Sequence, residues 1–218
     1  MPQHALVVAH IAVLGYWLGS ELVINSSYRY VCWASSMAFE ERDRLMDHVL
    51  HVDQHVRYAL VLQVGLGAAL AALYGYFPGG SVAVAAAVVA ALAWLALVEV
   101  THRMRKQPLG RRLAAIDRVL RYLLMAALTA TAGMALTIGT AVPSWLAWKL
   151  LLVVCVMACG VGIRFSIMDF FRTWAVIKRD GSSDDSERRI RFIYSYGTAI
   201  LVGLWVFIAG IVALSVWR

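Results

Sequence analysis

Three histidines in the stretch DHVLHVDQH have the spacing of side chains on one helix face. His48, His51 and His55 are three and four residues apart, so their imidazoles should project from successive turns. Neutral imidazole binds iron, copper and zinc, and histidines four residues apart can share one ion. The stretch therefore predicts a metal site, with Asp47 and Asp53 as further ligands or as acceptors that orient the histidines.

Two carboxylates extend this predicted site. Glu99 and His102 form a Glu-x-x-His motif, which places both side chains on one face. Paired helices with this motif build carboxylate-bridged di-iron sites, although only one clear copy is present here. Glu21 shares a helix stripe with His10 and Trp17, and an ionisable group inside a bilayer marks a functional position. The predicted metal ligands are His48, His51, His55, His102, Glu99 and Glu21.

The elements that must position these residues are apolar helices. Of the 218 residues 61% are hydrophobic and only 15% are charged, whereas soluble domains are about half apolar and a quarter charged. The apolar residues form runs of about 20, the length that crosses a bilayer as a helix. We predict an all-α polytopic membrane helix bundle, a single transmembrane domain over residues 1–218. About six spans are expected, at 5–25, 58–77, 82–100, 119–138, 145–163 and 198–216.

The basic residues predict the topology. All but two of the 20 lysines and arginines lie in or beside the first, third and fifth connections between spans. The positive-inside rule places these connections in the cytoplasm and both termini outside, and we expect a multi-pass protein of a bacterial-type inner (plasma) membrane. The net charge of +7 then reflects topology, and nucleic-acid binding is not expected.

The first connection has a helical pattern in its second half. From Met37 onward it lacks proline and glycine, which predicts a helix beginning near Ser36, capped by that serine, and running into the second span. Span two would then project into the cytoplasm. Glu21, the three-histidine stretch and the Glu99–His102 motif should all lie near the cytoplasmic membrane boundary.

Two short patches resemble known membrane families. His10-x6-Trp17-Leu-Gly is similar to the first helix of the flavin-free bacterial membrane protoporphyrinogen oxidases and of the copper-resistance D proteins. Trp145-Leu-Ala-Trp-Lys149-Leu resembles a helix start of the oxidases. The resemblance implies cofactor-binding roles for His10 and Lys149, and heme in the oxidase group. The Pro-Arg after helix one and the closing Asn-Glu-x-Pro of the oxidases are absent.

These features favour a membrane-bound metal-dependent oxidoreductase that acts on an apolar small molecule or quinone. The carboxylates favour non-heme iron, mono- or dinuclear, because heme b held by two histidines such as His55 and His102 needs no glutamate. The resemblance favours heme, and copper or zinc would also suit imidazole. Three interpretations stay open: transport of copper or another metal, a non-catalytic membrane anchor, and histidines that are merely solvated at the interface. Membrane lipids, a redox partner and a second copy are the expected partners.

Overall fold

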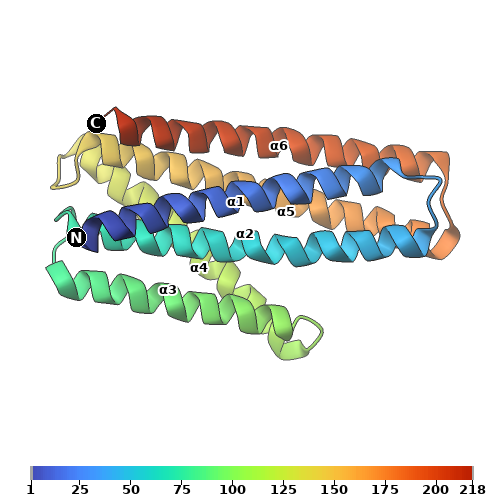
Figure 1. Cartoon of the computed structure of the whole chain (residues 1–218), viewed down its shortest axis with the longest axis horizontal. Coiled ribbons are helices and arrows are strands. Elements are labelled where there is room, and N and C mark those ends of the chain that lie inside the picture. The colour runs from blue at the N-terminus through green and yellow to red at the C-terminus, as the bar shows by residue number, and fades with distance from the viewer. Residues whose placement is uncertain (1, 218) are drawn as a thin grey trace. The chain divides into compact units, whose positions relative to one another are not determined.

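The computed structural model describes residues 2–217, and within them it contains helices and turns but no strand. The all-α fold predicted from the sequence is confirmed (Figure 1). The helices are α1 (Pro2–Trp33), α2 (Phe39–Leu73), α3 (Gly80–Arg103), α4 (Pro108–Thr137), α5 (Ser144–Asp180) and α6 (Asp184–Val216).

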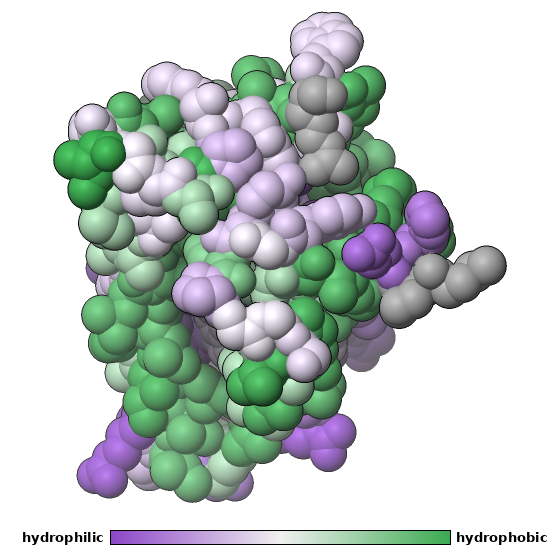
Figure 2. Space-filling model, turned by 90° about the vertical axis from the view of Figure 1, so that its left-hand side faces the viewer, coloured by the Kyte–Doolittle hydropathy of each residue, from purple (hydrophilic) through white to green (hydrophobic). Residues whose placement is uncertain are grey.

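All six helices are long and apolar enough to cross a membrane. Many large apolar side chains are exposed on them, among them Val82, Leu92 and Val206. Figure 2 looks at the end where α5 begins and α6 finishes, and hydrophobic side chains cover much of the surface in view. Exposed apolar surface on this scale is expected where lipid replaces water as the solvent. The protein is a multi-pass membrane protein in contact with lipid.

The helices are longer than the predicted spans. Helix α1 continues to Trp33, α5 continues to Asp180, and α6 begins as early as Asp184. Hydropathy detects only the apolar part of a helix, whereas the backbone continues through polar residues until a turn ends it. The predicted cap at Ser36 is wrong, because the Met37 N–H donates to the Ala34 carbonyl in a turn and α2 begins only at Phe39.

Backbone contacts divide the chain into two compact units. Unit 1 comprises the chain through Leu22 together with His51–Pro143. Unit 2 comprises Val23–Leu50 and the chain from Ser144 onward. Each unit therefore holds four helical segments: a part of α1, a part of α2, and two whole helices. The single-domain organisation stays a prediction.

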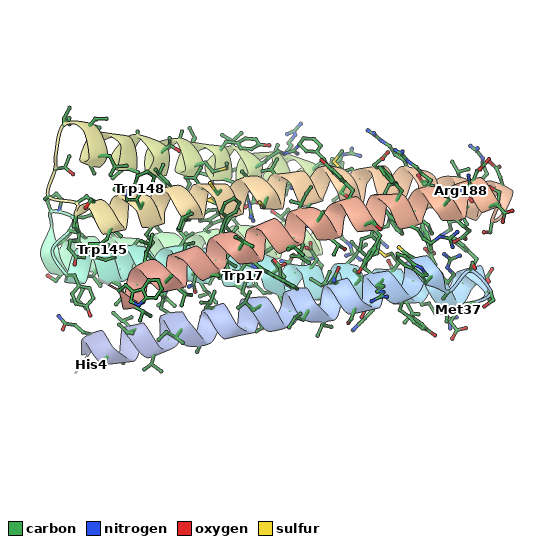
Figure 3. The ribbon with its side chains drawn as sticks, turned by 90° about the horizontal axis from the view of Figure 1, so that it is seen from above. His4, Trp17, Met37, Trp145, Trp148 and Arg188 are labelled. Atoms are coloured by element: carbon green, nitrogen blue, oxygen red, sulfur yellow. The ribbon has the colours of Figure 1, made fainter. Side chains whose placement is uncertain are left out.

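Unit 2 has an aromatic core. The ring of Phe170 stacks on Trp174 with centroids 5.2 Å apart, and Tyr28 meets both Phe170 and Tyr194 edge-on. Helices α5 and α6 run side by side, and Ser183 caps α6 by accepting from the Ser186 N–H. Figure 3 shows Met37 and Arg188 at one end of this unit, with Trp145 and Trp148 at the other.

A buried ion pair joins three helices of unit 2. The Arg42 guanidinium donates to both Glu187 carboxylate oxygens, at 2.7 and 3.0 Å, and to the Val31 carbonyl at 3.0 and 3.2 Å. The Arg42 and Glu187 side chains are only 2% and 6% exposed. Because charges are costly to bury unpaired, this bidentate pair fixes the start of α2 against α6 and the end of α1.

Unit 1 is held together by close helix packing and by polar contacts between its helices. A methyl group on Gly65 of α2 would collide with the Ala91 side chain of α3, so glycine is what allows these two helices to approach. Helices α3 and α4 are joined where Asp117 accepts from the Trp94 indole at 2.8 Å and from Arg121 at 3.0 Å. These contacts fix the position of α3, which holds Glu99 and His102.

Candidate functional site

Two of the predicted ligands come together between α2 and α3. The imidazole of His51 meets that of His102 edge-on, with ring centroids 6.0 Å apart and planes at 80°. His51 is exposed and His102 is half-buried. Two imidazoles from neighbouring helices therefore meet on an accessible face of unit 1.

The register between the two helices is fixed one turn further along. Gln54 is buried, and its amide donates to the Val98 carbonyl of α3 at 3.4 Å. Gln54 follows His51 by three residues, and Val98 precedes His102 by four, so the same turns hold both contacts. The His51–His102 pair thus depends on the α2–α3 alignment and not on either helix alone.

His55 contacts two tyrosines. The Tyr16 hydroxyl oxygen of α1 lies 2.5 Å from Nδ1 of His55, and the two rings meet edge-on. The Tyr58 ring, one turn further along α2, lies 6.1 Å from the His55 ring. His55 is therefore hydrogen-bonded to the Tyr16 hydroxyl and packed against the Tyr58 ring.

The Glu99 carboxylate also has hydrogen-bond partners. The Tyr58 hydroxyl and the Arg103 guanidinium both donate to its carboxylate. Arg103 is exposed and lies one turn along α3, in an ordinary i,i+4 ion pair. A carboxylate with these two donors has fewer free lone pairs for a metal. The two donors stabilise the ionised form of the Glu99 carboxylate, which is the form that can accept a proton.

Glu21 lies apart from the imidazoles. It is only 7% exposed and accepts from the indole of Trp17 at 2.8 Å. His10 also lies elsewhere on α1, and its Nε2 is 3.2 Å from the Gln63 amide nitrogen of α2. Both residues have polar partners on unit 1.

Two further predicted residues belong to unit 2. His48 is exposed on the unit 2 part of α2. Lys149, in the first turns of α5, donates to the Ser215 hydroxyl of α6 at 2.9 Å. The cofactor-binding role that the resemblance implies for His10 and Lys149 stays a prediction.

Among the six predicted metal ligands, His51 and His102 meet in a ring contact. Across residues 2–217, no set of three or more His, Cys, Asp or Glu side chains is arranged to hold a metal ion. Asp53, expected as a ligand or as an orienting acceptor, instead accepts from Arg57 at 2.8 Å. What this part of unit 1 offers is one pair of imidazoles beside the Tyr16–His55 and Tyr58–Glu99 contacts.

Sequence reasoning missed Tyr16, Tyr58 and Arg103. A local signal existed for two of them: Tyr58 follows His55 by three residues, and Arg103 follows Glu99 by four. Tyr16 had no such signal, since its contact with His55 joins residues far apart in the sequence.

Comparisons with family models, with curated proteins and with solved structures found no match to this chain. The assignment of function therefore rests on the arrangement of side chains described above.

Proposed function

We propose that the protein is an integral membrane oxidoreductase that binds a metal ion, non-heme iron foremost, through His51 and His102. The observation that supports this is the contact of the two imidazoles across α2 and α3, with centroids 6.0 Å apart. Imidazole binds first-row transition metals, and two protein ligands leave positions open for water or a substrate. A metal in this position would supply the electron-transfer step.

The neighbouring contacts support proton-coupled chemistry. Tyr58 of α2 donates to Glu99 of α3, and Tyr16 of α1 lies against His55 of α2, so two acid–base pairs are present in the same unit as the imidazole pair. Reduction or oxidation of a quinone-like molecule moves protons together with electrons. Glu99 and His55 are the groups of this chain that would take up or release those protons.

Access from the bilayer fits an apolar substrate. His51, His55 and Tyr16 are exposed, and the helices that contact this part of α2 carry exposed apolar side chains, among them Ile11 and Leu22 of α1 and Val100 of α3. A lipid-soluble molecule can reach them by lateral diffusion without crossing an aqueous phase. This is the reason to prefer a quinone-like substrate over a polar metabolite.

The test is elemental analysis with an absorption spectrum on detergent-purified protein. Wild type should contain iron or another transition metal without a strong heme band. The double variant H51A/H102A should lose the metal, and H48A, which removes an exposed histidine of the same helix, should keep it. Unchanged metal in H51A/H102A, or no metal in folded wild type, would overturn the proposal. A strong heme band would reassign the cofactor to heme b.

A further inference from the structure

The turn between α3 and α4 has a concentration of exposed positive charge. Helix α3 ends at Arg103 and α4 begins at Pro108, and the sequence contains no Asp or Glu between Glu99 and Asp117. The exposed cations that follow Arg103, in the turn and in the first third of α4, are Arg105, Lys106, Arg111, Arg112 and Arg118.

The two flanking carboxylates do not neutralise these cations. Glu99 is paired with Arg103, and Asp117 with Arg121. Among the residues that the structure describes, none of the five cations forms an ion pair with a carboxylate. Their charge is therefore available to an external anion.

The turn between α5 and α6 is different, although it too lies between two spans. Lys178 is 2.9 Å from Asp43, Arg179 is 2.7 Å from Asp180, and Arg189 pairs with Asp169 at 2.5 Å. Basic residues that serve topology alone can be neutralised in this way after folding. Three of the basic residues around the α5–α6 turn are thus paired with carboxylates, whereas the five cations around the α3–α4 turn are not.

Apolar side chains lie among these cations. Leu109 is 48% exposed and Ile116 is 50% exposed, both in the first turns of α4. The cations directly follow a membrane-spanning helix, so we expect them close to lipid phosphates, and charges attract each other over a Debye length of about 8 Å at physiological salt. Arginine binds phosphate through two parallel hydrogen bonds, and nearby leucine and isoleucine suit acyl chains.

We propose that the α3–α4 turn binds anionic phospholipid, with Arg105, Arg111 and Arg112 contacting the headgroup phosphate. The alternation of cations with exposed Leu109 and Ile116 favours a lipid over an acidic soluble protein, which would leave these apolar side chains in water. The turn tethers α3, the helix that holds Glu99 and His102, to anionic lipid. This inference is independent of whether a metal is bound.

The test measures the association of spin-labelled phosphatidylglycerol and phosphatidylcholine with the full chain in phosphatidylcholine bilayers. Wild type should prefer phosphatidylglycerol severalfold, and the preference should fall as salt is raised. R105Q/R111Q/R112Q should lose most of the preference. The charge-matched control R172Q/R179Q/R188Q, at exposed positions of unit 2, should keep it.

The conservative variant R105K/R111K/R112K, which keeps the charge, should retain part of the preference and shows that the turn tolerates substitution. Equal association of both lipids with wild type, or an unchanged preference in R105Q/R111Q/R112Q, would overturn the proposal. A third result would overturn the proposal in favour of an acidic protein partner. In that case wild type would show no lipid preference, and polyglutamate would bind wild type but not R105Q/R111Q/R112Q.

Discussion

His51 on α2 and His102 on α3 place two imidazole rings edge to face, with centroids 6.0 Å apart. These residues are far apart in the chain, and nothing in either helix alone requires them to meet. The buried Gln54, which donates to the Val98 carbonyl, and the close approach at Gly65 fix the alignment that brings them together.

The first prediction separates the histidines of the predicted cluster. His55 lies against Tyr16 and Tyr58, so H55A should leave the bound metal in place, whereas H51A should remove it. Metal content per chain, measured on both variants purified in parallel, checks this. Equal loss in the two variants would instead favour the original cluster of His48, His51 and His55.

The second prediction concerns the glycine that allows α2 and α3 to approach. G65A places a methyl group against Ala91, which should lower the free energy of unfolding by about 1–3 kcal/mol, a typical cost of overpacking. Metal content should fall with it, since the α2–α3 alignment shifts. Titration with a denaturing detergent in mixed micelles measures the stability.

A matched control for this variant is G133A on α4. A methyl group there would meet nothing within 4 Å, so no loss of stability is expected. If G65A behaved like G133A, the close approach would not be what positions α3.

The third prediction concerns the buried ion pair of unit 2. R42M leaves the Glu187 carboxylate buried without its guanidinium, which should cost about 3 kcal/mol of unfolding free energy. R42M/E187L removes both charges and should recover much of that loss. The exposed pair of Arg188 and Asp185, 3.9 Å apart, is the control, and R188Q should have little measurable effect. A double variant as unstable as R42M would contradict this account.

The fourth prediction tests the topology. Single cysteines at Arg188 and Ser144, at opposite ends of unit 2, are introduced after replacing Cys32, Cys155 and Cys159 with alanine. The positive-inside rule predicts that a membrane-impermeant maleimide labels R188C only from the cytoplasmic side and S144C only from the other. The reverse pattern, or labelling of both positions from one side, would contradict the predicted orientation.

The sequence was informative where structure follows from composition. Apolar runs of about 20 residues predicted all six membrane-spanning helices, because the bilayer demands both apolar side chains and internally bonded backbone. Helix ends were missed, as at Trp33 and Asp180, since polar residues continue a helix once ion pairs or packing stabilise them. The start of α2 was also missed. A turn closed by the Met37 N–H and the Ala34 carbonyl occupies the position of the expected Ser36 cap, and α2 begins at Phe39.

The candidate site was predicted only in part. Helical spacing identified His51 and His102 as candidates but could not pair them, because pairing depends on the register between two helices. Glu99 was predicted as a metal ligand. In the structure its carboxylate accepts a hydrogen bond from Arg103, which lies one turn away on the same helix. Tyr16 was out of reach, since only the folded α1–α2 contact reveals it.

The most direct measurement of the central claim is X-ray absorption spectroscopy at the edge of the metal that copurifies with the protein. In wild type, the spectrum should show two imidazole ligands. The remaining scattering atoms should be light atoms from water or substrate. H51A/H102A should show no bound metal. A spectrum with the signature of a porphyrin, or one in which H51A/H102A keeps the same imidazole ligands, would contradict the assignment of the site to His51 and His102.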